Sequence, residues 1–216
     1  MAGVKGKHRK QVFGLDIGTR SIVGTIGYFE DGKFHVLAQQ VHEHDTRAML
    51  DGQIHDIGKV AEGIVQVRRA LEKQLGKKMR EVCVAAAGRV LRTVTERIEM
   101  RFEQERDITQ EDIYELSMQG VQNAYEELYR DVGTDARFYC VGHTVMHYYV
   151  NGYQINSPKG HKAGELSADM IATFLPDEVV DGLYKAVEQA DLKVANLTLE
   201  PIAAIHVAIP EKFRLL

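Results

Sequence analysis

Alternating apolar and polar positions open the chain and predict three short strands. Residues 12–19 form an apolar run that leads into a glycine turn, and residues 21–28 follow as a run rich in β-branched side chains. The dipeptide Asp31-Gly32 provides the positive φ angle that a tight hairpin requires, and residues 34–38 return as a third strand. The pattern therefore predicts three antiparallel strands joined by tight turns.

A change of period then predicts a helix. Between residues 58 and 75 the apolar positions recur at spacings of three and four, and Gly76 is placed to end the helix. An uninterrupted apolar run at 81–88 follows, which is typical of a strand buried on both faces of a sheet. The chain up to this point predicts a β-β-β-α-β unit whose sheet begins antiparallel and becomes parallel.

The next segment has a more charged character and predicts an inserted module. Thr109 can cap a helix through its hydroxyl, with Asp112 three residues later as its partner in a capping box. Two strands are expected at 137–150 and near 152–155. The simplest arrangement is a compact β-α-β-β insertion between residues 89 and 165.

The last part of the chain is expected to rejoin the first unit. Residues 168–175 form an apolar run on both faces, and Pro176 is suited to open a helix. Residues 193–199 predict a final strand, after which Glu200 begins another helix. We therefore expect residues 166–216 to extend the sheet of the first unit.

Composition excludes several classes of protein. The 216 residues are 44% hydrophobic, and 27 Lys and Arg oppose 31 Asp and Glu, giving a net charge of −4, so nucleic acid is not expected as a partner. No apolar run is long enough to span a membrane. Residues 1–11 form a basic leader, expected to be disordered, without the apolar core of a secretory signal. Cys83 and Cys140 read as buried small residues in a reducing compartment.

The turn after the first strand carries the strongest chemical signal. In Gly14-Leu15-Asp16-Ile17-Gly18-Thr19, a glycine and a hydroxyl residue at the end of a strand allow backbone amides to approach a phosphate. Asp16, two positions before the glycine, can hold a metal-bound water. On local grounds alone, the same segment is equally an ordinary hairpin turn.

The order of elements adds a family resemblance. The glycine-rich hairpin, the β-β-α-β continuation and the sequence Glu-Pro-Ile-Ala-Ala at 200–204 resemble the first half of the actin/Hsp70/sugar-kinase ATPase superfamily. An insertion placed after the strand at 81–88 resembles that of the FtsA family of bacterial cell-division proteins. Further similar segments are the apolar strand 82–88, the helix start 107–113, the loop 156–160 and the segment 49–56.

This resemblance implies an α/β fold: an RNase H-like, actin-like ATPase subdomain with a mixed sheet, interrupted by a βαββ, SHS2-like insertion. Residues 12–88 and 166–216 would form the ATPase subdomain, the first half of a nucleotide cleft, and residues 89–165 the inserted interaction subdomain. The cofactors would be ATP and Mg²⁺.

The resemblance also assigns roles to particular residues. Asp16 would hold magnesium through water, and Gly18 and Thr19 would contact the β- and γ-phosphates. Arg20 or Ser21 would supply a further phosphate contact. Glu200, which opens the helix that couples the two domains, would polarise the attacking water and so be the catalytic residue.

The function implied is that of an FtsA-like protein, which polymerises and links the tubulin-like division ring to the membrane. Its partners would be other copies of itself and division-ring proteins, chiefly through residues 89–165. The parent protein would be cytoplasmic and peripheral to the membrane, which it would contact only through a C-terminal helix outside this sequence. A second phosphate loop is also absent up to Leu216, so we expect weak ATPase activity of the parent and little of this chain.

Two alternatives remain at the level of sequence. The first is a PilM-like pilus-assembly scaffold that uses ATP as a structural ligand, and a bound asparagine-rich peptide would distinguish it. The second is a sugar-kinase-type phosphotransferase, which requires a general-base aspartate in a substrate cleft. The position of the insertion disfavours this second alternative.

Overall fold

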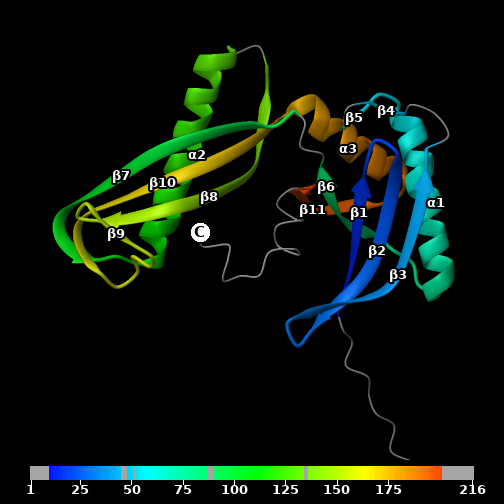
Figure 1. The fold of residues 1–216 in the computed structure, drawn as a ribbon, viewed down its shortest axis with the longest axis horizontal. Coiled ribbons are helices and arrows are strands. Elements are labelled where there is room, and N and C mark those ends of the chain that lie inside the picture. Colours follow the sequence, from blue (N-terminus) through cyan, green and yellow to red (C-terminus); the bar gives the residue numbers. More distant parts are fainter. Residues whose placement is uncertain (1–9, 45–47, 51, 87–89, 134–135, 201–216) are drawn as a thin grey trace, which may run out of the picture. The chain divides into compact units, whose positions relative to one another are not determined.

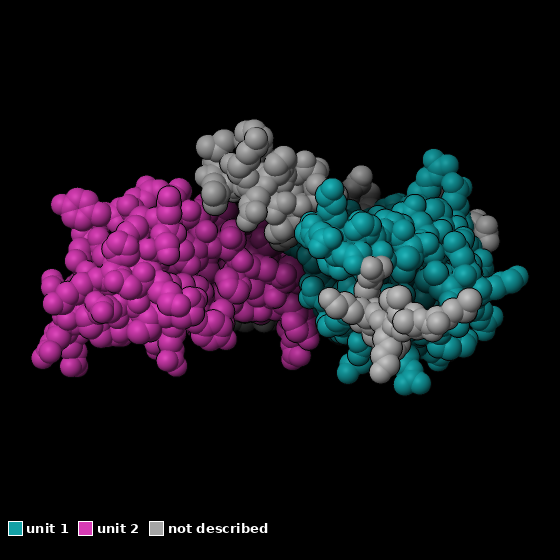
Figure 2. Space-filling view, turned by 90° about the horizontal axis from the view of Figure 1, so that it is seen from below, with its two compact units in different colours: residues 1–89, 178–216 teal, residues 90–177 magenta. Residues whose placement is uncertain are grey.

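The chain forms two compact units, each built around its own sheet (Figure 1). The structure is a computed structural model, and it describes residues 10–44, 48–50, 52–86, 90–133 and 136–200. The first unit comprises residues 1–89 and 178–216, and the second comprises residues 90–177 (Figure 2). Most of the expected basic leader lies outside the described residues, and Gln11 already belongs to the first strand.

The first unit contains a mixed five-stranded sheet in the order β11-β6-β1-β2-β3. Its strands are β1 (Gln11–Ile17), β2 (Ser21–Glu30), β3 (Lys33–Glu43), β6 (Glu81–Ala86) and β11 (Lys193–Leu199). β1, β2 and β3 are antiparallel to one another, whereas β6 and β11 run parallel to β1. This confirms the expected change from antiparallel to parallel pairing. A small hairpin, β4 (Met49–Leu50) and β5 (Gln53–Ile54), precedes the first helix.

Two helices precede strands of this sheet: α1 (Ile57–Leu75) leads to β6, and α3 (Asp177–Gln189) leads from the second unit to β11. The Asp56 carboxylate caps α1 by accepting a hydrogen bond from Lys59 N, and Gly76 ends the helix at φ +64°, as the sequence predicts. α1 packs closely on β2, because a Cβ atom at Gly24 would lie 2.4 Å from Val67 Cγ1. Gly24 therefore sets how near the helix lies to the sheet.

The second unit packs one long helix against an antiparallel sheet in the order β7-β10-β8-β9. Its elements are β7 (Arg92–Asp107), α2 (Gln110–Val132), β8 (Phe138–Val150), β9 (Tyr153–Ile155) and β10 (Lys162–Pro176). Leu116 of α2 and Leu166, Met170 and Phe174 of β10 are buried in one cluster, which forms the core of this unit. α2 starts at the Thr109 cap, as predicted from the sequence.

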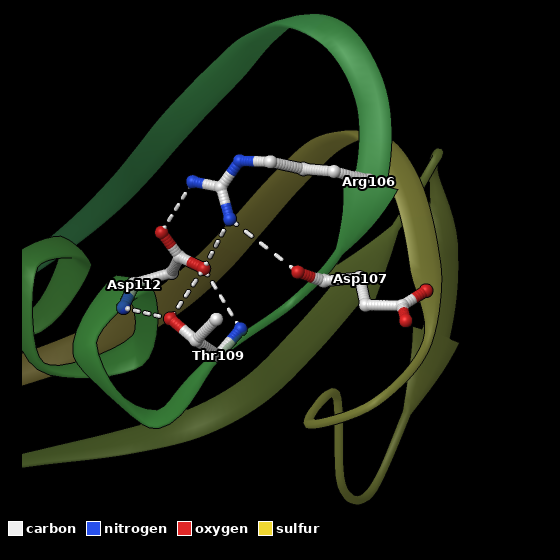
Figure 3. Close-up of polar contacts among 4 residues, drawn as sticks. All are labelled: Arg106, Asp107, Thr109 and Asp112. Atoms are coloured by element: carbon white, nitrogen blue, oxygen red, sulfur yellow. Dashed lines mark hydrogen bonds and ion pairs between the residues drawn. The ribbon is translucent and has the colours of Figure 1, made fainter.

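Four residues around this cap form a polar cluster (Figure 3). Asp112 Oδ2 accepts hydrogen bonds from the Thr109 backbone N and hydroxyl, both at 2.8 Å, and Thr109 Oγ1 accepts one from Asp112 N. Arg106, at the end of β7, donates to both carboxylate oxygens of Asp112 at 2.6 and 2.8 Å. The cluster joins the end of β7 to the start of α2 and satisfies backbone groups that a helix start leaves open.

The expected boundary between insertion and parent sheet, at residues 165 and 166, is wrong. β10 crosses this boundary and pairs with β7 and β8 along most of its length, so residues 166–176 belong to the second unit. The apolar run at 168–175 is explained by its central place in that sheet, between two strands and under α2. The two ends of the unit still meet, because Arg92 pairs with Phe174.

Candidate functional site

Asp16 and Glu200 meet at one edge of the first unit's sheet. β1, β6 and β11 are parallel neighbours, and Asp16, Ala85 and Thr198 share a register across them. Asp16 thus lies near the carboxyl end of β1, and Glu200 directly follows β11. The carboxyl ends of parallel strands are where open α/β sheets bind their ligands. The two carboxyls lie within hydrogen-bonding reach of each other.

The environment of the pair favours the neutral form of both carboxyls. Burial raises the pKa of Asp16, and its hydrogen bond with Glu200 partly offsets this rise. Burial also raises the pKa of Glu200, with further contributions from the charge of Asp16 and their shared hydrogen bond. Two neighbouring carboxyls with raised pKa values are an arrangement that a divalent cation stabilises in the charged form.

The turn between β1 and β2 lies beside this pair. Gly18 N donates to Ser21 O at 3.0 Å, and a Cβ at Gly18 would lie 3.2 Å from the same oxygen. The Gly18 amide is therefore used within the turn, and glycine serves here mainly for close approach of the backbone. The His44 ring contacts the Gly18 carbonyl through Nε2 at 3.1 Å, and His44 N donates to Arg20 O at 3.0 Å.

The side chains of residues 19–21 differ in the hydrogen-bonding or charged groups that they leave available for a ligand. Thr19 Oγ1 accepts a hydrogen bond from Gly52 N at 3.2 Å, which leaves its O–H as a donor. Arg20 Nη2 lies 3.5 Å from Glu43 Oε1, and both side chains are largely exposed. Ser21 begins β2 opposite Glu43 in the ladder.

Of the residues selected from the sequence, the fold brings Asp16, Gly18, Thr19 and Glu200 to one sheet edge, whereas Arg20 pairs with Glu43. The reasoning from sequence missed two anchors of the turn, His44 and Gly52. Both lie more than 20 positions away in the chain, so no local pattern connects them with the turn. Within the described ranges, no group of three or more His, Cys, Asp or Glu is arranged to hold a metal ion.

Comparisons of the sequence with curated proteins find similarity to the cell division protein FtsA from different bacteria. No protein-family model matches the chain. The cell division protein FtsA of Escherichia coli K12 is 26% identical over 214 residues, which cover 98% of this chain and 48% of that protein. FtsA of Streptococcus pneumoniae is 25% identical over 199 residues, which cover 92% of this chain and 41% of that protein. The chain spans about half the length of the curated relatives it matches.

The fold of this chain is similar to that of a solved structure. A chain of the PilM-PilN type IV pilus biogenesis complex superposes with a TM-score of 0.60, covering 92% of this chain and 50% of its own, at 13% identity. Among the helices in the described part of the chain, none is long and apolar enough to cross a membrane. By sequence the chain is similar to FtsA over nearly its whole length, and by fold it is similar to a chain of the PilM-PilN complex.

Proposed function

We propose that this chain holds magnesium-ATP at the carboxyl edge of β1 and is the first part of an FtsA-like, actin-family ATPase. The observation that carries the proposal is the Asp16–Glu200 pair, which lies beside the Gly18-Thr19 turn and has raised pKa values. Perturbed carboxyls at the carboxyl ends of parallel strands are typical of functional sites.

Each residue then has a defined role. Asp16 would hold Mg²⁺ through its water shell, and the magnesium would supply charge neutralisation at the phosphates. Thr19 would donate its free O–H to a phosphate, and Gly18 would admit the phosphate close to the backbone. Glu200 would accept a proton from the attacking water, since a raised pKa brings a carboxylate nearer to the range of an effective general base. Arg20 would have to leave Glu43 to reach a phosphate, so Ser21 is the better candidate for the further contact.

The first test replaces Asp16 by Asn in the intact protein. This substitution keeps the size of the side chain and removes the charge, so we expect the magnesium-dependent part of ATP affinity to fall at least tenfold. For the unsubstituted protein, magnesium-ATP affinity should rise with pH through the raised carboxyl pKa values, because the charged pair binds the cation. Isothermal titration calorimetry with and without Mg²⁺ measures both effects.

The matched control for this test is Asp31→Asn. Asp31 lies in the β2–β3 turn at φ +49°, a conformation that Asn accepts, and it is far along the chain from the pair. This control should bind as the unsubstituted protein does. Unchanged magnesium dependence in Asp16→Asn would show that the assignment of the phosphate site is wrong.

The proposal extends to the whole protein by way of its similarity to FtsA. We propose that it polymerises, acts at the inner face of the cell membrane and contacts other copies or division-ring proteins through residues 90–177. Replacing residues 90–177 by a short glycine linker should preserve magnesium-ATP binding, because the first unit keeps all five strands of its sheet. Filament formation, followed by electron microscopy and sedimentation, should be lost. A replacement variant that still polymerises would contradict this role of the second unit.

A second candidate function is a PilM-like scaffold. The superposition on PilM over 92% of this chain favours it, although a likeness at this identity concerns the fold. A scaffold that uses ATP as a structural ligand would bind magnesium-ATP without turnover. Measured ATP hydrolysis that Glu200→Gln abolishes would favour the ATPase, whereas binding without hydrolysis would favour the scaffold.

A further inference from the structure

The turn between β1 and β2 is held by a residue that lies just beyond the end of β3. The ring of His44 contacts the Gly18 carbonyl through Nε2 at 3.1 Å, and His44 N donates to Arg20 O at 3.0 Å. His44 directly follows β3, which ends at Glu43. One residue from another strand end therefore bonds two carbonyl groups of the turn.

The bond from the His44 ring replaces a bond that a turn of this kind ordinarily makes within itself. A carbonyl oxygen only accepts hydrogen bonds, so the contact with Gly18 requires the ring proton to be on Nε2. In a β-turn the carbonyl of the first residue commonly accepts from the amide of the fourth, which is here Ser21 N. The turn has the opposite bond, from Gly18 N to Ser21 O at 3.0 Å. His44 thus occupies the acceptor with which the Ser21 amide would otherwise pair.

The direction of the two carbonyls determines the direction of two amides. In a trans peptide group the C=O and the following N–H point to opposite sides. Because Gly18 O points to the His44 ring, the Thr19 amide points away from that ring. Because Arg20 O points to His44 N, the Ser21 amide also points away from residue 44. Amides that a turn directs outward in this way can bind an anion.

The His44 ring is supported by contacts that reach α1. The rings of His42 and His44 lie edge to face, with their centroids 6.3 Å apart. His42 packs against α1 at Gly63, where a Cβ atom would lie 2.8 Å from His42 Cδ2. The position of the His44 ring therefore depends on how α1 packs on the sheet, and not only on the turn that the ring contacts.

We propose that His44 is a positioning residue for phosphate binding. It holds the carbonyls of Gly18 and Arg20 on its own side of the turn. The amides of Thr19 and Ser21 then point to the phosphate groups of a bound nucleotide or polyphosphate, whereas a carbonyl turned to that side would repel them. His44 itself does not touch the ligand. This inference rests on the proposed function, which places magnesium-ATP beside the turn.

The first test compares two replacements of His44 in the intact protein. His44→Leu removes the ring donor, whereas His44→Gln keeps a side-chain N–H donor at a similar distance from the backbone. The probes are magnesium-ATP and magnesium tripolyphosphate, which carries the phosphates without the nucleoside. Titration calorimetry should show about fivefold weaker binding of both probes by His44→Leu, because one neutral hydrogen bond contributes about 1 kcal/mol. His44→Gln should restore most of the affinity.

The matched control is His35→Leu, which makes the same change on β3 itself. His35 pairs with Tyr28 toward the other end of the β2–β3 ladder, and the two rings stack with their centroids 5.2 Å apart. We expect His35→Leu to bind both probes as the unsubstituted protein does, even if its Tm falls. Thermal denaturation of both leucine variants then separates a loss of affinity from a loss of stability.

A second measurement needs no substitution. Nitrogen-15 NMR spectroscopy of the full chain reports which ring nitrogen of His44 carries the proton. At a pH where the ring is neutral, we expect the proton on Nε2. A neutral ring with its proton on Nδ1 would overturn the proposal, because Nε2 could then not donate to Gly18 O.

Failure of this inference can be distinguished from failure of the proposed function. If Asp16→Asn lowers the magnesium-dependent affinity and His44→Leu does not, the nucleotide site stands and the role of His44 is wrong. If His44→Gln binds as weakly as His44→Leu, side-chain packing rather than the ring donor explains the loss, and the role is again wrong. If the unsubstituted protein binds neither probe, the proposed function and this inference are both overturned.

Discussion

At the scale of single residues, Asp112 shows how one carboxyl can determine a local structure. Its side chain is nearly buried, and Arg106 contacts both of its oxygens (Figure 3). The hydrogen bonds from Arg106 hold the pKa of Asp112 far below its usual range, with help from the Thr109 backbone and hydroxyl. The folded unit therefore binds this proton more weakly than the unfolded chain does. The carboxylate stabilises the fold above about pH 4, and this contribution is lost as the pH falls through the folded pKa.

We expect Asp112→Asn to lower the free energy of unfolding by about 2 kcal/mol at neutral pH, because charged hydrogen bonds to a buried group are lost. The difference from the unsubstituted chain should shrink as the pH is lowered below about 4. Urea denaturation across this pH range measures both effects. Asp107→Asn is the control, since Figure 3 shows the Asp107 carboxylate directed away from the cluster. A difference that stays constant with pH would contradict the electrostatic account.

At the scale of elements, the distance between α2 and its sheet depends on Gly120. A Cβ atom at this position would lie 2.6 Å from Met170 Cε and 2.8 Å from Ile98 Cδ1, both in the core of the second unit. At such distances the ends of these side chains must shift, and a side chain larger than a methyl group would force the packed core to rearrange.

Gly120→Val should therefore destabilise the second unit by about 2 kcal/mol, which is within the range measured for overpacked cores. Gly120→Ala should destabilise the second unit by less, because the higher helix propensity of alanine offsets about 1 kcal/mol of the packing penalty. Thermal denaturation followed by circular dichroism provides the measurement. The control Gln119→Val places the same side chain on the exposed face of α2 and should cost well under 1 kcal/mol. If both valine variants lost the same amount of stability, helix propensity rather than core packing would explain the effect at position 120.

At the scale of the whole molecule, the course of β10 decides where one unit ends and the other begins. β10 is a central strand of the second sheet, and six of its residues belong to the buried cluster: Ala163, Leu166, Ala168, Met170, Ala172 and Phe174. The second unit should therefore fold by itself only when residues 166–176 are included.

We expect an isolated segment of residues 90–177 to unfold cooperatively in urea. A segment of residues 90–165 should show no cooperative transition, because it lacks the strand between β7 and β8. Equilibrium denaturation followed by circular dichroism distinguishes the two segments. Cooperative unfolding of the shorter segment would restore the boundary expected from the sequence.

The sequence alone determined the local elements well, because local physical chemistry decides them. The spacing of apolar residues and the signals at Gly76 and Thr109 predicted α1 and the start of α2 closely. The motif around Asp16 and the acidic Glu200 were also visible as residues of chemical interest. What the sequence could not decide is which sheet a strand joins. An apolar run such as 168–175 satisfies its hydrogen bonds equally well between β7 and β8 or at the edge of the first sheet.

Only the tertiary structure decided that β10 belongs to the second unit. It also brought Asp16 and Glu200, 184 positions apart in the chain, to one edge, through the parallel register of β1, β6 and β11. The contacts of His44 and Gly52 with the Gly18-Thr19 turn arise in the same way, from strand pairing and chain packing. Long-range pairing is cooperative and depends on the whole sheet, so no local pattern in the sequence encodes it.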